Sequence, residues 1–111
     1  MIFLLMKPLC CSNKELTKEF ADLAKFLRLI GEDNRLKIIC MLKGGERCVC
    51  EIVEYLDLPQ NLVSTHLKAL KDFKLVESRK DWKKVYYRLN KVVFNKYNSL
   101  LTNFLKNYHG K

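Results

Sequence analysis

The stretch that decides the fold covers residues 57–71 and reads DLPQNLVSTHLKALK. Pro59 ends a preceding helix and suits the start of the next one, so a helix is expected over residues 60–71. Its outward face would be rich in amide, hydroxyl and basic groups, which is typical of a helix that reads DNA. Four apolar residues are expected to face inward: Leu62, Val63, Leu67 and Leu70. The polar face would consist of Gln60, Asn61, Ser64, Thr65, His66, Lys68 and Lys71.

The neighbouring segments complete a winged helix-turn-helix. A short helix is expected over residues 49–55, and its connection to the next helix through Pro59 gives the helix-turn-helix arrangement. Residues 75–79 and 84–89 are rich in β-branched and aromatic side chains, and they predict two strands joined by a charged turn at residues 80–83. A helix-turn-helix followed by a basic hairpin predicts a mainly α fold with a small β-hairpin, the winged helix.

Helices are also expected on both sides of this unit. A capping-box pattern at Ser12 opens a helix that ends near Gly31, and a further helix starts at Asp33 or Asn34 and runs through Leu42 to a stop at Gly44 and Gly45. A last helix covers residues 91–108. The first and last of these carry long apolar stripes, which predict a homodimer whose two-fold axis presents two DNA-reading helices. The alternative is that the stripes only close the monomer.

Length and composition narrow the class of protein. The chain has 111 residues, which suits one domain, and a mean hydropathy of -0.16. No apolar run approaches the roughly 18–20 residues that span a bilayer, and the apolar N-terminal segment lacks the features of a signal peptide. Five cysteines, an odd number, indicate reduced thiols rather than a disulfide framework. We therefore expect a cytoplasmic protein without membrane association.

Charge is unevenly distributed along the chain. The net charge is +9, with 10 basic and 9 acidic side chains in residues 1–70 and 11 basic and 3 acidic in residues 71–111. A one-sided basic load on a small domain is the electrostatic pattern of a nucleic-acid binder. Ribosomal proteins and binders of acidic proteins share it, so charge alone does not decide the function.

Two cysteines flank Val49 at the start of the short helix. Residues i and i+2 of a regular helix point about 200° apart, so Cys48 and Cys50 converge either if Cys48 lies at or before the N-cap or if a bound ion distorts the first turn. A helix N-terminus favours the thiolate, and thiolates select soft ions such as Cd(II), Pb(II) or As(III). Closing a chelate there would strain the helix that precedes the DNA-reading helix. Cys40, on an apolar face, is expected to be a core residue.

Several stretches resemble the ArsR/SmtB metalloregulators. Residues 29–39 look like the entry into that family's second helix, residues 46–52 are close to its metal box, and residues 60–70 are similar to its recognition helix. The resemblance implies one domain over residues 1–111, with an N-terminal arm (1–12), the metal box and helix-turn-helix (46–71), a wing (75–89) and a dimerisation helix (91–108).

This resemblance also implies a function. It implies a dimeric repressor that holds an inverted-repeat operator in double-stranded DNA and releases it on binding metal. The recognition-helix contacts would carry over onto Gln60, Asn61, Ser64, Thr65 and His66, with Lys68 on the same face. The wing contacts would carry over onto Arg79, Lys80, Lys83 and Lys84.

A third and fourth metal ligand are expected from the N-terminal arm. In the arsenic-sensing branch the next cysteine would stand at Val53, so that pattern is incomplete, whereas the cadmium/lead-sensing branch takes cysteines from the arm, here Cys10 and Cys11. The expected site is Cys48 and Cys50 with one or both of these, for As(III), Cd(II) or Pb(II), and with no organic cofactor. The family's C-terminal zinc site is absent, because residues 91–108 contain no Asp, Glu or His.

Other functions compete with metal sensing. The thiols could sense redox state or reactive sulfur instead, or Cys48 and Cys50 could be inert and the arm without function. A thiol enzyme is disfavoured, because the chain has no C-x-x-C motif and no Gly-rich phosphate loop. A constitutive nucleic-acid binder is disfavoured by the polar face of helix 60–71, since RNA modules would show exposed aromatic residues on a sheet.

Overall fold

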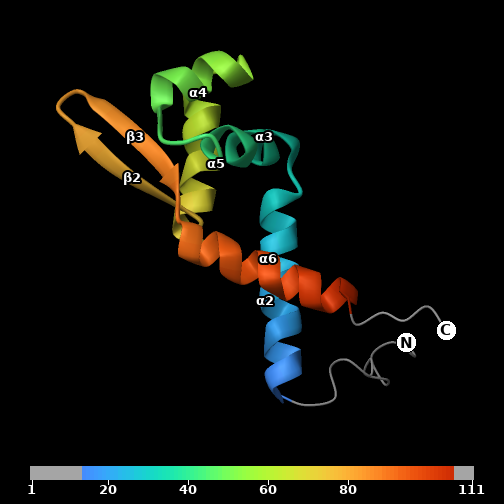
Figure 1. The fold of residues 1–111 in the computed structure, drawn as a ribbon. Helices are drawn as coiled ribbons and strands as arrows, with labels where there is room; N and C mark the ends of the chain where they lie inside the picture. The colour runs from blue at the N-terminus through green and yellow to red at the C-terminus, as the bar shows by residue number, and fades with distance from the viewer. Residues whose placement is uncertain (1–13, 107–111) are drawn as a thin grey trace.

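The computed structural model describes residues 14–106, and it is a winged helix-turn-helix (Figure 1). The predicted fold class is therefore confirmed. The predicted capping box at Ser12 and the last two residues of the helix predicted over residues 91–108 lie outside the described residues. The helices are α2 (Lys14–Ile30), α3 (Asp33–Leu42), α4 (Val49–Leu56), α5 (Gln60–Asp72) and α6 (Lys91–Lys106). The strands are β1 (Arg47–Cys48), β2 (Val76–Asp81) and β3 (Lys84–Leu89).

The sheet contains one strand more than the sequence predicted. It is antiparallel with the order β1-β3-β2, and the two-residue strand β1 pairs Arg47 with Tyr87 and Cys48 with Tyr86. Two residues are too few to show an alternating pattern, so nothing in the sequence predicts β1. The wing turn also differs from the prediction: Lys80 and Asp81 still belong to β2, and only Trp82 and Lys83 form the turn, with Trp82 at a positive φ of 59°.

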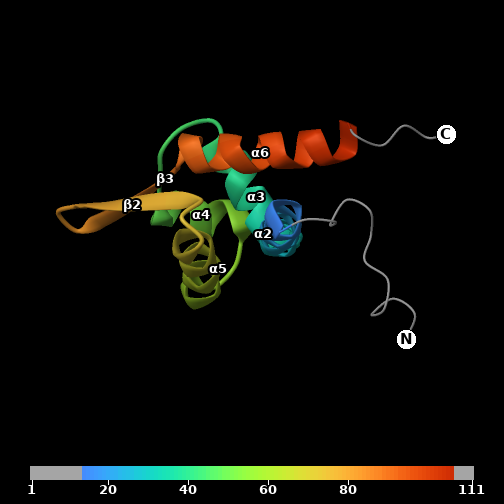
Figure 2. The ribbon, with the colours of Figure 1, turned by 90° about the horizontal axis from the view of Figure 1, so that it is seen from below.

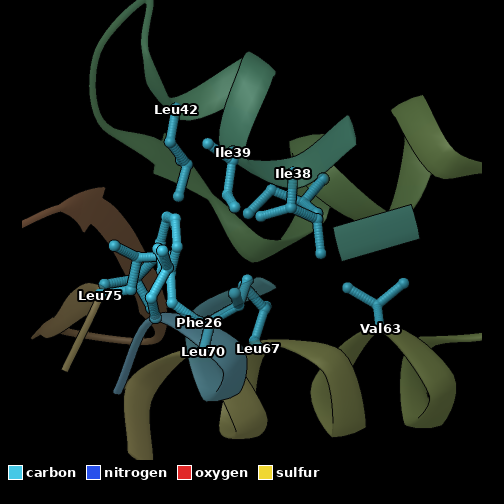
Figure 3. Packing of buried hydrophobic residues seen from close by; sticks show 11 residues of the cluster. Phe26, Ile38, Ile39, Leu42, Val63, Leu67, Leu70 and Leu75 are labelled. Carbon is cyan, nitrogen blue, oxygen red and sulfur yellow. The ribbon is translucent and has the colours of Figure 1, made fainter. Parts of the chain in front are cut away.

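The core lies where α3, α4, α5 and the start of β2 meet. Figure 3 shows the side chains of Ile38, Ile39 and Leu42 on α3 facing those of Val63, Leu67 and Leu70 on α5. Leu62 was expected to face inward, but it is 46% exposed. The reason is rotation about the helix axis: Val63, Leu67 and Leu70 lie within one narrow arc, and Leu62 stands about 100° away from Val63.

Helix α2 contributes Leu23 and Phe26 to this core, and α6 crosses α2 beside it (Figure 1). Phe26 of α2 stacks on Tyr97 of α6 with ring centroids 4.9 Å apart, and Phe73 packs against the same tyrosine at 5.1 Å. Figure 2 shows α6 and α5 on opposite sides of the layer that contains the wing. The outward face of α5 is therefore free of α6. No helix in residues 14–106 combines the length and apolar character that crossing a bilayer would require.

Cys40 is not a core residue, contrary to the prediction. It is exposed, and it lines a pocket of about 330 Å³ between α2, α3 and α6. Ile38, Ile39 and Leu42 occupy one side of α3 over an arc of about 100°, and Cys40 falls about 100° beyond the edge of that arc. A short apolar run on a helix marks the helix without marking which member faces the core.

Truncation of a core residue should separate buried from exposed apolar positions. Ile52 is fully buried, so Ile52→Ala should lower the free energy of unfolding by about 2–5 kcal/mol through lost burial and a residual cavity. The exposed Leu62 is the matched control, and Leu62→Ala should change the free energy of unfolding by less than about 0.5 kcal/mol. Urea unfolding at one fixed protein concentration measures both, and equal losses would contradict this core.

Candidate thiol site and nucleic-acid interface

Cys48 stands where strand β1 ends and helix α4 begins. It is the N-cap of α4, with extended backbone angles of φ -71° and ψ 148°. Its backbone N–H donates to Glu51 Oε1 at 2.9 Å, and its Sγ accepts from the backbone N–H of Cys50 at 3.4 Å. These two bonds form a capping box with a thiol in the place that serine or threonine usually takes.

The extended backbone at the N-cap brings the two thiols together. Cys50 Sγ lies 2.6 Å from Cys48 Sγ and donates to it. Of the two routes to convergence considered from helix geometry, the structure shows the first, because Cys48 is the N-cap of α4. The hydrogen bond from Cys50, together with the backbone N–H groups of Cys50 and Glu51, lowers the pKa of Cys48. The same thiol–thiol hydrogen bond raises the pKa of Cys50.

This arrangement fits a soft ion only in part. Two convergent sulfurs can chelate a thiophilic ion, and thiolate ligands suit one. Within residues 14–106, no group of three or more His, Cys, Asp or Glu side chains is placed to hold a metal ion. The further predicted ligands, Cys10 and Cys11, lie outside the described residues.

A row of side chains connects the thiol pair to the wing. Cys48 is paired with Tyr86 across β1 and β3, and Tyr86 is paired with Arg79 across β3 and β2. The guanidinium of Arg79 lies over the Tyr86 ring, 4.6 Å from its centroid. Glu46, two residues before Cys48, accepts from Arg79 Nη2 at 2.7 Å and from Nε at 2.9 Å. The start of α4 is thus tied to the wing through both backbone and charge.

The predicted role of Arg79 must account for this ion pair. Its hydrogen bonds to Glu46 raise the pKa of Arg79, and the same contact lowers the pKa of Glu46. Arg79 also lies near a second carboxylate, because Asp81 Oδ2 is 3.7 Å from Arg79 Nη1. Arg79 therefore keeps its positive charge, and this charge is already paired with Glu46 in the free protein. Sequence reasoning missed Glu46, because the two residues are 33 positions apart and no local pattern joins them.

The outward face of α5 presents most of the polar side chains predicted for it. Gln60, Asn61, Ser64, Thr65 and Lys68 are all exposed. Thr65 Oγ1 donates to the Asn61 carbonyl at 2.9 Å, and Lys68 Nζ pairs with Asp72 at 3.0 Å. Four neutral polar side chains and one paired lysine are therefore exposed on this face.

His66 differs from the expectation of an exposed contact. Only 16% of its side chain is exposed, and its Nδ1 accepts from Arg35 Nε at 3.3 Å. It sits on the flank of α5 that faces α3, about 100° around the helix from Thr65. The sequence signal that placed it with the polar face was its residue type.

The wing is the second basic surface. Lys80, Lys83 and Lys84 are exposed on the hairpin, and Trp82 at its tip is 84% exposed. Lys83 Nζ lies 5.3 Å from the centroid of the Trp82 ring. All four basic side chains predicted for the wing are exposed, and of these Arg79 is held in an ion pair with Glu46.

Comparisons with known proteins agree with this geometry. The model of a family described as "Bacterial regulatory protein, arsR family" matches residues 32–78, which contain the thiol pair and all of α5. The arsenical resistance operon repressor of Staphylococcus aureus is 34% identical over 76 residues, which cover 68% of this chain and 73% of that protein. The cadmium resistance regulatory protein CadC of Listeria innocua is 37% identical over 68 residues, or 60% of this chain and 57% of that protein.

A solved structure extends the similarity to the wing and the outer helices. Reduced HlyU from Vibrio cholerae superposes with a TM-score of 0.71 at 32% identity, covering 83% of this chain and 97% of that one. The resemblance inferred from the sequence is confirmed by these matches.

The pKa values of the two thiols should differ from that of an ordinary cysteine in opposite directions. Because the pKa of Cys48 is lowered and that of Cys50 is raised, alkylation of Cys48 should reach half its maximal rate at a lower pH than alkylation of Cys50. Iodoacetamide labelling followed by mass spectrometry across a pH series measures both midpoints. Cys48→Ser keeps an N-cap oxygen and should move the Cys50 midpoint down. A Cys50 midpoint that does not move would contradict the thiol–thiol contact.

Proposed function

This chain belongs to the arsR family of bacterial regulatory proteins, and we propose that it represses transcription until Cys48 and Cys50 bind a thiophilic metal or metalloid ion. Its family and relatives are DNA-binding transcriptional regulators and not enzymes. The observation that carries the proposal is the convergence of the two sulfurs at the N-cap of α4. The protein would act in the cytoplasm, where thiols stay reduced.

DNA binding is assigned to α5 and the wing. The exposed amide and hydroxyl groups of Gln60, Asn61, Ser64 and Thr65 have the donors and acceptors that read base edges in the major groove. The basic groups of Lys68, Lys80, Lys83 and Lys84, and Arg79 once released from Glu46, would contact phosphates.

The protein would act as a homodimer on an inverted repeat. Phe20 and Leu27 of α2 and Phe104 and Leu105 of α6 are each at least 40% exposed, and the rings of Phe20 and Phe104 lie 6.5 Å apart. This apolar surface is what a second copy would cover. A two-fold axis there would place two α5 helices on one face of the DNA. Residues 1–12 would be an arm, 46–71 the metal box and helix-turn-helix, 75–89 the wing and 91–108 the dimerisation helix.

The inducer would be held by Cys48, Cys50 and one or both of Cys10 and Cys11. A site of three thiolates would suit As(III) or Pb(II), and four would suit Cd(II). Cys48 could not move toward such an ion alone, because its backbone pairs with β3 and its N–H is bound by Glu51. Helix α4 packs directly on α5, so a change at this N-cap would reach both DNA-binding elements.

Thiol oxidation is the second candidate. The two thiols already lie in contact, so an oxidant that takes two electrons and two protons from them would join them in a disulfide. In this alternative no third ligand is needed. The similarity to a protein whose solved structure is of its reduced form favours keeping it.

Metal binding and DNA release should occur together. Anaerobic titration of the reduced protein with arsenite or Cd(II) should give a thiolate absorption band that saturates at about one ion per protomer, and the loaded protein should bind operator DNA about 5–150-fold more weakly. Cys48→Ser should abolish both effects, whereas the matched control Cys40→Ser should retain them. No band with either ion, from protein that still binds DNA, would favour oxidation.

Release of Arg79 should be visible in the salt dependence of DNA binding. The slope of log K against log salt is negative, and Lys83→Ala should reduce its magnitude by about 0.9. Glu46→Gln should increase its magnitude by about 0.9, because the released Arg79 gains a phosphate contact. Glu77→Gln, which frees Arg88 from a 3.1 Å ion pair elsewhere on the wing, is the matched control for charge. Weaker binding by Glu46→Gln would mean that Glu46 orients Arg79 for DNA.

A further inference from the structure

Arg35 of α3 joins three helices at the corner where α2, α3 and α5 meet. Its Nη1 donates to the Leu29 carbonyl at 3.2 Å, and its Nε donates to His66 Nδ1 on α5 at 3.3 Å. Its own backbone N–H donates to Glu32 Oε1 at 3.0 Å, which caps α3. The Leu29 carbonyl lies in the last turn of α2, where carbonyls lack a partner within the helix. One half-buried guanidinium thus holds the end of α2 and the side of α5 at once.

The contact with Arg35 fixes the tautomer of His66. A guanidinium is always protonated, so Arg35 Nε can only donate, and His66 Nδ1 must then accept. The proton of the neutral ring is therefore on Nε2. Among the described residues, no hydrogen bond occupies that Nε2–H, while 16% of the side chain remains exposed.

We propose that Arg35 is a positioning residue for DNA binding, which sets His66 as an Nε2–H donor toward DNA and fixes α5 against the α2–α3 corner. DNA offers matching acceptors in phosphate oxygens and in the O6 and N7 atoms of guanine. Glu32 Oε1, 3.8 Å from His66 Nδ1, would attract a proton to the wrong nitrogen if Arg35 were absent. This inference rests on the proposed binding of DNA by α5.

The tautomer can be measured in the free protein, independently of DNA. Long-range proton–nitrogen NMR spectra at about pH 8.5, where an ordinary imidazole is neutral, distinguish the two ring nitrogens. His66→Ala identifies the signals and separates them from those of His109. Wild-type protein should show protonated Nε2 only, and Arg35→Gln should show a mixture of tautomers. The same single tautomer in both proteins would overturn the proposal, whether or not the protein proves to bind DNA.

A double-mutant cycle tests the effect on DNA. With a duplex selected from random sequence by the wild-type protein, Arg35→Gln should bind about ten-fold more weakly, which corresponds to about 1.4 kcal/mol. Arg35→Gln combined with His66→Ala should bind no more weakly than His66→Ala alone, because both substitutions remove one interaction. Fully additive losses would overturn the proposal.

Charge and folding are controlled separately. Arg28 of α2 and Arg35 line one surface pocket, so Arg28→Gln removes one positive charge from the same place. An equal loss of affinity in Arg28→Gln would mean that Arg35 acts only through its charge. If Arg35→Gln fails to fold, Arg35→Lys takes its place, since lysine keeps the charge but cannot span both acceptors. Wild-type tautomer and affinity in Arg35→Lys would overturn the proposal equally.

Discussion

The rest of the structure depends on a single residue that belongs to two elements at once. The backbone of Cys48 completes a strand beside the wing, and its side chain caps the helix that follows. A capping side chain requires extended backbone angles, and these are the angles that a strand supplies. The two demands are compatible only because β1 is two residues long and ends at the N-cap. This junction brings the second sulfur to the first without distorting the helix.

The junction also joins α5 and the wing, the elements proposed to bind DNA, into one unit. Helix α4 packs on α5 from one side of the junction, and β3 carries the wing on the other. The core residues of α3 and α5 face each other, as Figure 3 shows, and their packing holds α5 against α3. Charge is confined to the surfaces of this unit, since no polar or charged residue among those described is buried.

Local sequence patterns predicted most of the helices and strands, but few of the contacts between residues far apart in the sequence. Apolar spacing and capping residues located α3, α4 and α5, because those signals act within one or two turns. Strand β1 escaped, because a two-residue strand exists only through its partner. Cys40 and Leu62 were misassigned because a helical face is decided by a rotation of about 100°, which is one residue. The contacts of Glu46 with Arg79 and of Arg35 with His66 join residues more than 30 positions apart. Helix geometry limited the ways in which Cys48 and Cys50 could converge, but the N-cap position of Cys48 came only from the structure, and the full ligand set stays a prediction.

The single tryptophan of the chain stands at the tip of the wing, almost fully exposed and held there by the positive φ of its own residue. An indole in that position is far from the apolar core, so the intrinsic fluorescence of this protein is a report from the wing. Quenching by iodide or a shift in emission would follow the hairpin tip, while Tyr97, packed against Phe26 and Phe73, belongs to the body of the molecule. The chain thus carries a built-in optical probe at one extremity, free of any label.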